Sequence, residues 1–225
     1  QAGTVMIKDK SNPKFANIRA LFPIPSLTMH FVMSKDSGVT KFSDLEAKTI
    51  LLGKGSFGAK EGAKYLKLFG LEGKVKLANV ELNNAVPAIK NRQIDGFVTA
   101  GSYPAPNVLE AAAGVGVSLI SLSDAQVKKT KRTRLVIPAG TYPGVNQDTV
   151  TTSLPVIAYT ITNMDDETAY QLTKTYWEQI SSMGKAFPWW NGVSAKMLSN
   201  IFGKIHAGAL RYYDEAGITV PAANR

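Results

Sequence analysis

The chain has 225 residues, of which 44% are hydrophobic and 19% are charged, and it contains no cysteine. This composition supports a folded core, excludes disorder as the main state, and excludes disulfide frameworks, thiolate metal sites and thiol nucleophiles. The formal net charge is +9.

Part of this positive charge is local, because five basic residues lie close together at Lys128, Lys129, Lys131, Arg132 and Arg134. No aromatic residue is interleaved with this basic run, so a solvated helix or loop face is favoured over nucleic-acid binding. No segment approaches the roughly 20 apolar residues that a membrane-spanning helix needs, so the sequence predicts a protein that is not inserted in a membrane.

The first two thirds of the chain alternate between strand-like and helix-like segments. Ser26–Ser34 mixes β-branched, aromatic and apolar residues, and Thr49–Leu52 is a second strand of the buried type, followed by a glycine-rich loop and a helix from Lys60 to Gly70. The alternation then repeats. Further strands are expected at Lys76–Leu82, Ile94–Thr99 and Gly116–Leu122, with helices at Ala85–Asn91 and Ala105–Ala113. This order predicts an α/β fold with a mainly parallel sheet.

Beyond Gly144 the pattern changes. Thr149–Thr162 is a long extended stretch in which Pro155 favours an edge or kinked strand, and Asp165–Glu167 places acidic residues at the start of a long helix. Shorter helices are expected at Ser194–Phe202 and Ala207–Ala216.

The α/β region is thus flanked on both sides by segments that do not belong to it. We expect two lobes, one formed by residues 36–150 and the other by residues 1–35 together with 151–225.

Three loops are candidate ligand-binding segments, because α/β sheets place ligands beyond the carboxyl ends of their strands, where the loops gather at one rim. In the first loop, Gly55, Ser56, Phe57 and Gly58 lie between a strand and a helix, where backbone N–H groups favour an anion. The loop matches neither a P-loop nor a dinucleotide-binding motif. A tight turn that binds nothing explains the local pattern equally well.

The other two loops each carry a tyrosine. Tyr103 and Pro104 lie between a strand and a helix. Two interpretations of the Tyr103 ring are equally favoured, contact with a solute and packing against the neighbouring prolines. Tyr142 lies in Ile137–Gly144, where turn chemistry explains every residue except the tyrosine, so a structural role is slightly favoured over a binding role.

Catalytic motifs are missing from the sequence. The two histidines, His30 and His206, form no metal-binding pair, and there is neither a nucleophile elbow nor a paired-carboxylate motif. A lone histidine is more often structural than a ligand. The sequence therefore predicts no enzyme activity, no metal site and no cofactor.

Five segments follow one another in an order that resembles the TAXI-type solute-binding proteins of TRAP transporters. They are Asp36–Leu71, Ala88–Pro106, Ile137–Val145, Pro155–Glu178 and Lys204–Gly217. The resemblance implies a bilobal, type II periplasmic-binding-protein-like fold and a small anionic solute, either a glutamate-like amino acid or another carboxylate. It further implies TRAP membrane subunits as partners and a periplasmic or other extracytoplasmic location.

The sequence departs from this family in three places. Phe57 is bulky where the family's turn has a glycine, and the family's Leu-His-Pro-Gly-Ala motif reads Ile205–Ala209 without its proline. The family's glycine-rich N-terminal portion has no counterpart, which implies one complete and one incomplete lobe. The alternatives are a surface interaction or immunogenic protein that keeps the scaffold without a solute and, third, an enzyme on a bilobal fold.

Overall fold

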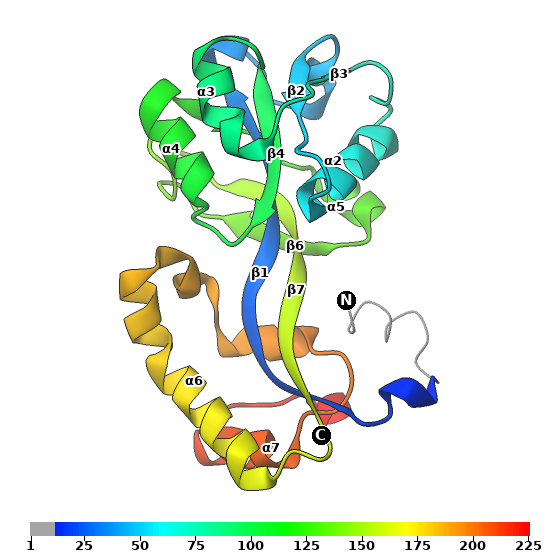
Figure 1. The fold of residues 1–225 in the computed structure, drawn as a ribbon, viewed down its shortest axis with the longest axis vertical. Helices are drawn as coiled ribbons and strands as arrows, with labels where there is room; N and C mark the ends of the chain where they lie inside the picture. The colour runs from blue at the N-terminus through cyan, green and yellow to red at the C-terminus, as the bar shows by residue number, and fades with distance from the viewer. Residues whose placement is uncertain (1–11) are drawn as a thin grey trace. The chain divides into compact units, whose positions relative to one another are not determined.

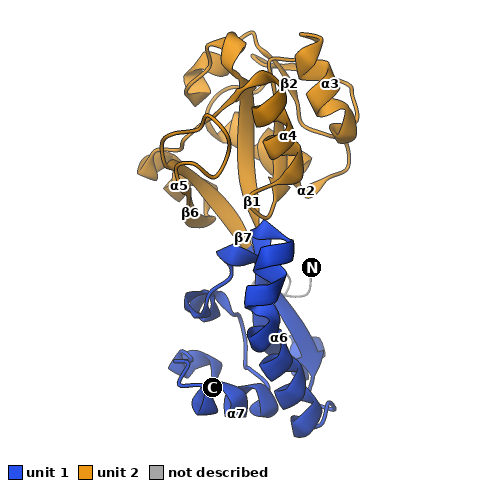
Figure 2. Cartoon of the chain, turned by 90° about the vertical axis from the view of Figure 1, so that its left-hand side faces the viewer, with its two compact units in different colours: residues 1–26, 155–225 blue, residues 27–154 orange. Residues whose placement is uncertain are grey.

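The computed structural model describes residues 12–225, which form two compact units (Figure 2). Unit 1 combines the described residues up to Ser26 with Pro155–Arg225, and unit 2 is Leu27–Leu154. The sequence placed the corresponding boundaries at residues 36 and 150, and the part of that expectation that concerns residues 1–11 lies outside the described residues. Strands β1 (Ile18–Ser34) and β7 (Thr149–Ile161) each contribute residues to both units.

The strands form one mixed sheet in the order β3-β2-β4-β1-β7-β6, and β5 also pairs with β1 (Figure 1). The shorter strands are β2 (Thr49–Leu51), β3 (Lys76–Leu77), β4 (Gly96–Gly101), β5 (Val117–Leu119) and β6 (Thr133–Ile137). The α/β class expected from the sequence is confirmed.

The expectation of a mainly parallel sheet is wrong. Only β2 is parallel to its neighbours β3 and β4, whereas β1 runs antiparallel to β4 and β5, and β6 runs antiparallel to β7. Parallel neighbours need a crossover connection, and α2 and α3 supply it between β2, β3 and β4. Helix α4 also connects β4 to β5, but these two strands do not pair with each other, since each pairs antiparallel with β1. Strand–helix alternation therefore predicted the direction of these three strands but not that of β1 or β6.

Helices cover both faces of the sheet in unit 2. Because successive strand residues point to opposite faces, Phe31 and Val98 pack in the cluster that includes α2 (Phe57–Leu68) and α5 (Asp124–Thr130). Their neighbours Val32 and Phe97 pack with α3 (Ala85–Lys90) and α4 (Pro106–Val115) on the other face. Unit 2 is thus a three-layer α/β/α body.

Three predicted elements are shorter than expected. The strand at Gly116–Leu122 is reduced to β5, Val117–Leu119. The strand at Lys76–Leu82 shrinks to the two residues of β3, because its partner β2 is itself short and Leu77 is 58% exposed. The helix at Ser194–Phe202 is a 3₁₀ helix at Ala195–Asn200.

Strand β7 as a whole lies between β1 and β6 in the sheet. Its pairing with β6 ends at Ser153, so Pro155 lies at a local edge of β7 where its missing N–H is not needed on that side.

Unit 1 is built around α6 (Asp166–Ala186) and α7 (Ala207–Glu215). Asp165 caps α6 by accepting a hydrogen bond from the backbone N–H of Thr168 at 2.8 Å. The two helices approach so closely that a side chain at Gly208 would collide with the carbonyl oxygen of Asp166. His206 caps α7 by accepting a hydrogen bond from the backbone N–H of Gly208, so its role in unit 1 is structural. Within residues 12–225, no helix is both long and apolar enough to cross a membrane.

Candidate functional site

Three loops of unit 2 meet beyond the carboxyl ends of β2 and β4. Since these strands are parallel neighbours, the turn after β2 and the loop after β4 leave the sheet at the same edge. A Cβ added at Gly58 would lie 2.9 Å from the backbone nitrogen of Ala100, so the turn rests directly on the end of β4. The third loop reaches the same place through Tyr142, whose hydroxyl accepts a hydrogen bond from the backbone N–H of Ala105 at 2.8 Å.

The turn Gly55–Gly58 begins helix α2. Gly55 has a φ of +71°, which favours glycine, and Ser56 is the N-cap residue. The Ser56 hydroxyl accepts a hydrogen bond from the backbone N–H of Ala59 at 2.9 Å and donates one to the carbonyl oxygen of Gly53 at 3.2 Å. The hydroxyl that the sequence offered to a solute is therefore used within the turn.

Helix α2 leaves two backbone donors available at its start. Among the described residues, the N–H groups of Phe57 and Gly58 have no hydrogen-bond partner, because the Ser56 side chain caps Ala59 instead. These groups and the helix dipole favour a negative charge at this point. The Phe57 side chain is half-buried and packs against the core cluster on the α2 face of the sheet, so its ring does not occupy only the space of the turn.

Tyr103 and Pro104 are both half-buried in the loop after β4. The peptide bond between them is cis, and the Tyr103 ring packs against the core cluster on the α4 face. Burial raises the pKa of Tyr103 above its usual range. The rest of this side chain is exposed.

Tyr142 has no exposed surface through which it could contact a solute. Its hydroxyl lies 2.8 Å from Nε2 of His30, while Nδ1 of His30 lies 3.0 Å from the carbonyl oxygen of Thr28. A carbonyl can only accept, so Nδ1 carries the proton and Tyr142 donates to Nε2. Burial lowers the pKa of His30 to about 4 and raises that of Tyr142. Tyr142 therefore ties its loop to β1 and to the start of α4.

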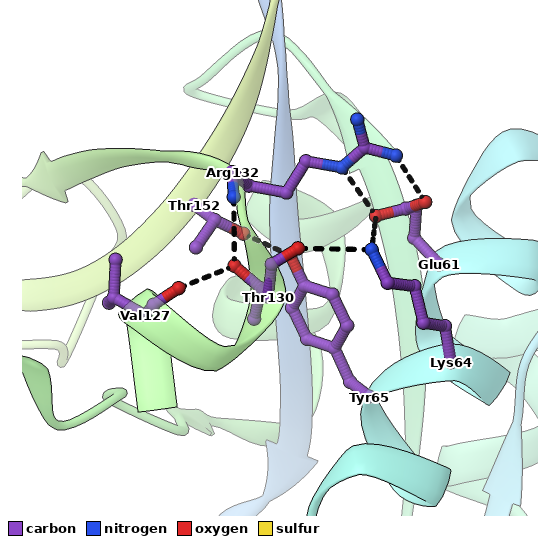
Figure 3. Close-up of polar contacts among 7 residues, drawn as sticks. All are labelled: Glu61, Lys64, Tyr65, Val127, Thr130, Arg132 and Thr152. Carbon is purple, nitrogen blue, oxygen red and sulfur yellow. Dashed lines mark hydrogen bonds and ion pairs between the residues drawn. The ribbon is translucent and has the colours of Figure 1, made fainter. Parts of the chain in front are cut away.

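A cluster of polar residues beside α2 was missed by the sequence analysis (Figure 3). Nε and Nη2 of Arg132 donate to the two carboxylate oxygens of Glu61 at 2.8 and 2.6 Å. Lys64 donates to the carbonyl oxygen of Thr130 at 3.0 Å, with its Nζ 3.9 Å from Glu61. The hydrogen bonds and charge of Glu61 raise the pKa of Arg132.

The basic run is thus not uniformly solvated. Lys128, Lys129, Lys131 and Arg134 are exposed as expected, but Arg132 is half-buried. The one local signal was Glu61, which falls on the buried face of α2 with Gly58, Gly62 and Tyr65. A carboxylate on an apolar helix face needs a cationic partner, but nothing local shows which residue supplies it.

Comparison with known proteins gives one family and several solved structures. The model of the NMT1-like family matches residues 5–217. The sulfonate-binding protein SsuA of Methylobacillus flagellatus KT has a TM-score of 0.44 at 15% identity, covering 77% of this chain and 46% of that one.

Two further structures are similar. Substrate binding domain 2 of GlnP from Lactococcus lactis has a TM-score of 0.45 at 9% identity, covering 80% of this chain and 64% of that one. The arginine-, lysine-, histidine-binding protein ArtJ from Geobacillus stearothermophilus has a TM-score of 0.41 at 15% identity, covering 83% and 68%. The chain therefore spans between 46% and 68% of the length of these three proteins.

Proposed function

We propose that this chain, which belongs to the NMT1-like family, is the solute-binding part of a transport system and holds a small anionic solute at the loop edge of unit 2. The observation that carries the proposal is the meeting of three loops at one end of β2 and β4. Gly58 lies against Ala100 there, and Tyr142 holds Ala105. Loops gathered at the carboxyl ends of parallel strands are the usual ligand position in α/β sheets.

In this proposal each loop has a separate task. Gly55, Ser56, Phe57 and Gly58 form the anion-binding turn, to which Phe57 and Gly58 contribute backbone N–H groups and Ser56 contributes the cap that holds them in place. Tyr103, next to Pro104, contributes an aromatic surface. Tyr142 supports the Tyr103 loop by accepting a hydrogen bond from the backbone N–H of Ala105.

The finer assignment follows the order of sequence segments described above. We take the solute to be a glutamate-like amino acid or another carboxylate. The chain would then act outside the cytoplasm as a TAXI-type protein that delivers this solute to TRAP membrane subunits. Solute capture by such a protein requires no covalent chemistry.

Isothermal titration calorimetry tests the proposed function with defined probes. L-Glutamate, succinate and methanesulfonate are each titrated into the protein. L-Glutamine, which lacks the side-chain carboxylate of glutamate, and succinamide, which lacks both carboxylates of succinate, are the amide counterparts. We expect at least one acid to bind saturably and more tightly than its amide. Absence of binding by every acid would contradict the proposal.

A further inference from the structure

We infer that Arg132 is the cationic anchor for the solute's anionic group and that Glu61 is its positioning residue. This inference rests on the proposed function, because it names the side chain that distinguishes a charged solute from a neutral one at the same site. It starts from the way in which Glu61 fixes the guanidinium.

Glu61 holds Arg132 in a single orientation. It lies one helical turn after Phe57 in α2, and its side chain is only 9% exposed. Both of its carboxylate oxygens accept hydrogen bonds from Arg132, one from Nη2 at 2.6 Å and one from Nε at 2.8 Å. A planar guanidinium held at two nitrogens cannot rotate, so the direction of its remaining nitrogen is set in advance.

The remaining nitrogen of Arg132 is available. Nη1 has no hydrogen-bond partner within the described part of the chain, and Figure 3 shows it directed away from Glu61. The Arg132 side chain is 25% exposed. The guanidinium carbon lies 5.9 Å from the ring centre of Phe57, which is the first residue of α2 and part of the proposed anion-binding turn.

The charges of the cluster do not balance. Glu61 supplies one negative charge, while Arg132 and Lys64 both lie within ion-pair distance of it, at 2.6 and 3.9 Å. Lys64 is already held by the carbonyl oxygen of Thr130, whereas Arg132 keeps a free edge. An anion beside Phe57 would meet a cluster with one net positive charge, in which the guanidinium geometry is fixed before binding, and this lowers the entropy lost on binding.

A purely structural pair is the competing explanation, since Arg132 also links α2 to the segment between α5 and β6. The two explanations predict different effects of removing the charges. Loss of a structural pair lowers stability and leaves the preference for an acid over its amide unchanged. Loss of an anchor removes that preference.

The test uses the double variant Glu61→Gln/Arg132→Gln, which leaves no unpaired carboxylate in the core. Its matched control is Arg134→Gln, which removes a positive charge two residues away on β6, from an exposed ion pair with Asp124. Calorimetry measures succinate against succinamide and L-glutamate against L-glutamine, and circular dichroism measures the thermal midpoint of each unliganded variant. Arg132→Lys provides a second test that keeps the charge if the double variant does not fold.

We expect the double variant to bind the preferred acid ~10- to 100-fold more weakly, the loss associated with one hydrogen bond to a charged group, with little change for the amide. Arg132→Lys should lose several-fold, and Arg134→Gln should match the wild type. If the wild type binds acids and the folded Arg132 variants keep its acid preference, this inference is wrong while the proposed function stands. If the wild type binds no acid, both are wrong.

Discussion

The hydroxyl of Tyr142 donates a hydrogen bond to Nε2 of His30 at 2.8 Å, between side chains that are 0% and 1% exposed. The same hydroxyl accepts from the backbone N–H of Ala105. One phenol thus joins the loop that carries it, the strand β1 and the start of α4. The position of the Tyr103 loop depends on this buried contact.

Replacing Tyr142 by Phe should destabilise the protein by about 1–3 kcal/mol, because the N–H of Ala105 and Nε2 of His30 would stay buried without a partner. Urea denaturation measures the change in the free energy of unfolding. Tyr103→Phe is the control, since no hydrogen bond of the Tyr103 hydroxyl is found among residues 12–225, and it should change stability by less than about 0.5 kcal/mol. Equal losses in the two variants would contradict the structural role of Tyr142.

The buried His30 predicts a pH dependence of stability. Its pKa is about 4 in the folded protein against 6.5 for an ordinary histidine, so between these values the unfolded chain binds a proton that the folded protein does not. The free energy of unfolding should therefore be highest above pH 6.5 and fall as the pH decreases, by about 2 kcal/mol at pH 5. Urea denaturation at pH 7 and pH 5 measures this loss. In His30→Gln, which cannot titrate, most of the difference should disappear, and an unchanged difference would refute the assignment to His30.

Thr28 and Thr151 allow a matched comparison of two buried hydroxyls in unit 2. Oγ1 of Thr151 donates to the carbonyl oxygen of Met29 at 2.7 Å, whereas Oγ1 of Thr28 is buried with no partner among the described residues. Thr151→Val should cost about 1 kcal/mol, while Thr28→Val should be neutral or stabilising. Thermal denaturation of both variants measures the difference. A clear loss in Thr28→Val would show that its hydroxyl has a partner, such as an ordered water.

The capping role of Ser56 predicts an order of stability between two variants. Ser56→Ala removes the acceptor for the N–H of Ala59 and should cost about 1 kcal/mol, whereas Ser56→Gly should cost only a few tenths, because glycine leaves an N-terminus accessible to water. Chemical denaturation monitored by circular dichroism measures both. Identical stability of Ser56→Ala and the wild type would show that the cap does not contribute to α2.

Local sequence patterns predicted the parts of the fold that local chemistry determines. The alternation around Thr49–Leu52 and Ile94–Thr99 predicted parallel strands, and the structure makes β2 and β4 parallel neighbours with the loops that follow them at one edge. The antiparallel direction of β1 could not be predicted in this way, because the alternation of strands and α-helices begins only at β2.

In the candidate site, local sequence patterns likewise did not predict the contacts between side chains that are far apart in the chain. Turn residues around Tyr142 predicted a rigid loop but not the burial of its ring, which depends on His30, 112 residues earlier in the chain. The contact between Glu61 and Arg132 joins residues 71 apart, so a charge run that is solvated at most positions gave no sign that one member is bound. Whether two such distant residues form a contact depends on the tertiary packing.

The central claim is that a small acid binds at the turn before α2, and an NMR titration of the ¹⁵N-labelled protein tests it most directly. L-Glutamate, succinate and methanesulfonate are added separately while the amide signals are followed. We predict saturable shifts for Gly55, Phe57, Gly58 and Tyr103 with at least one acid, and none for the exposed Lys129 on α5. Absence of saturable shifts with every acid, or shifts only at residues remote from this turn, would contradict the claim.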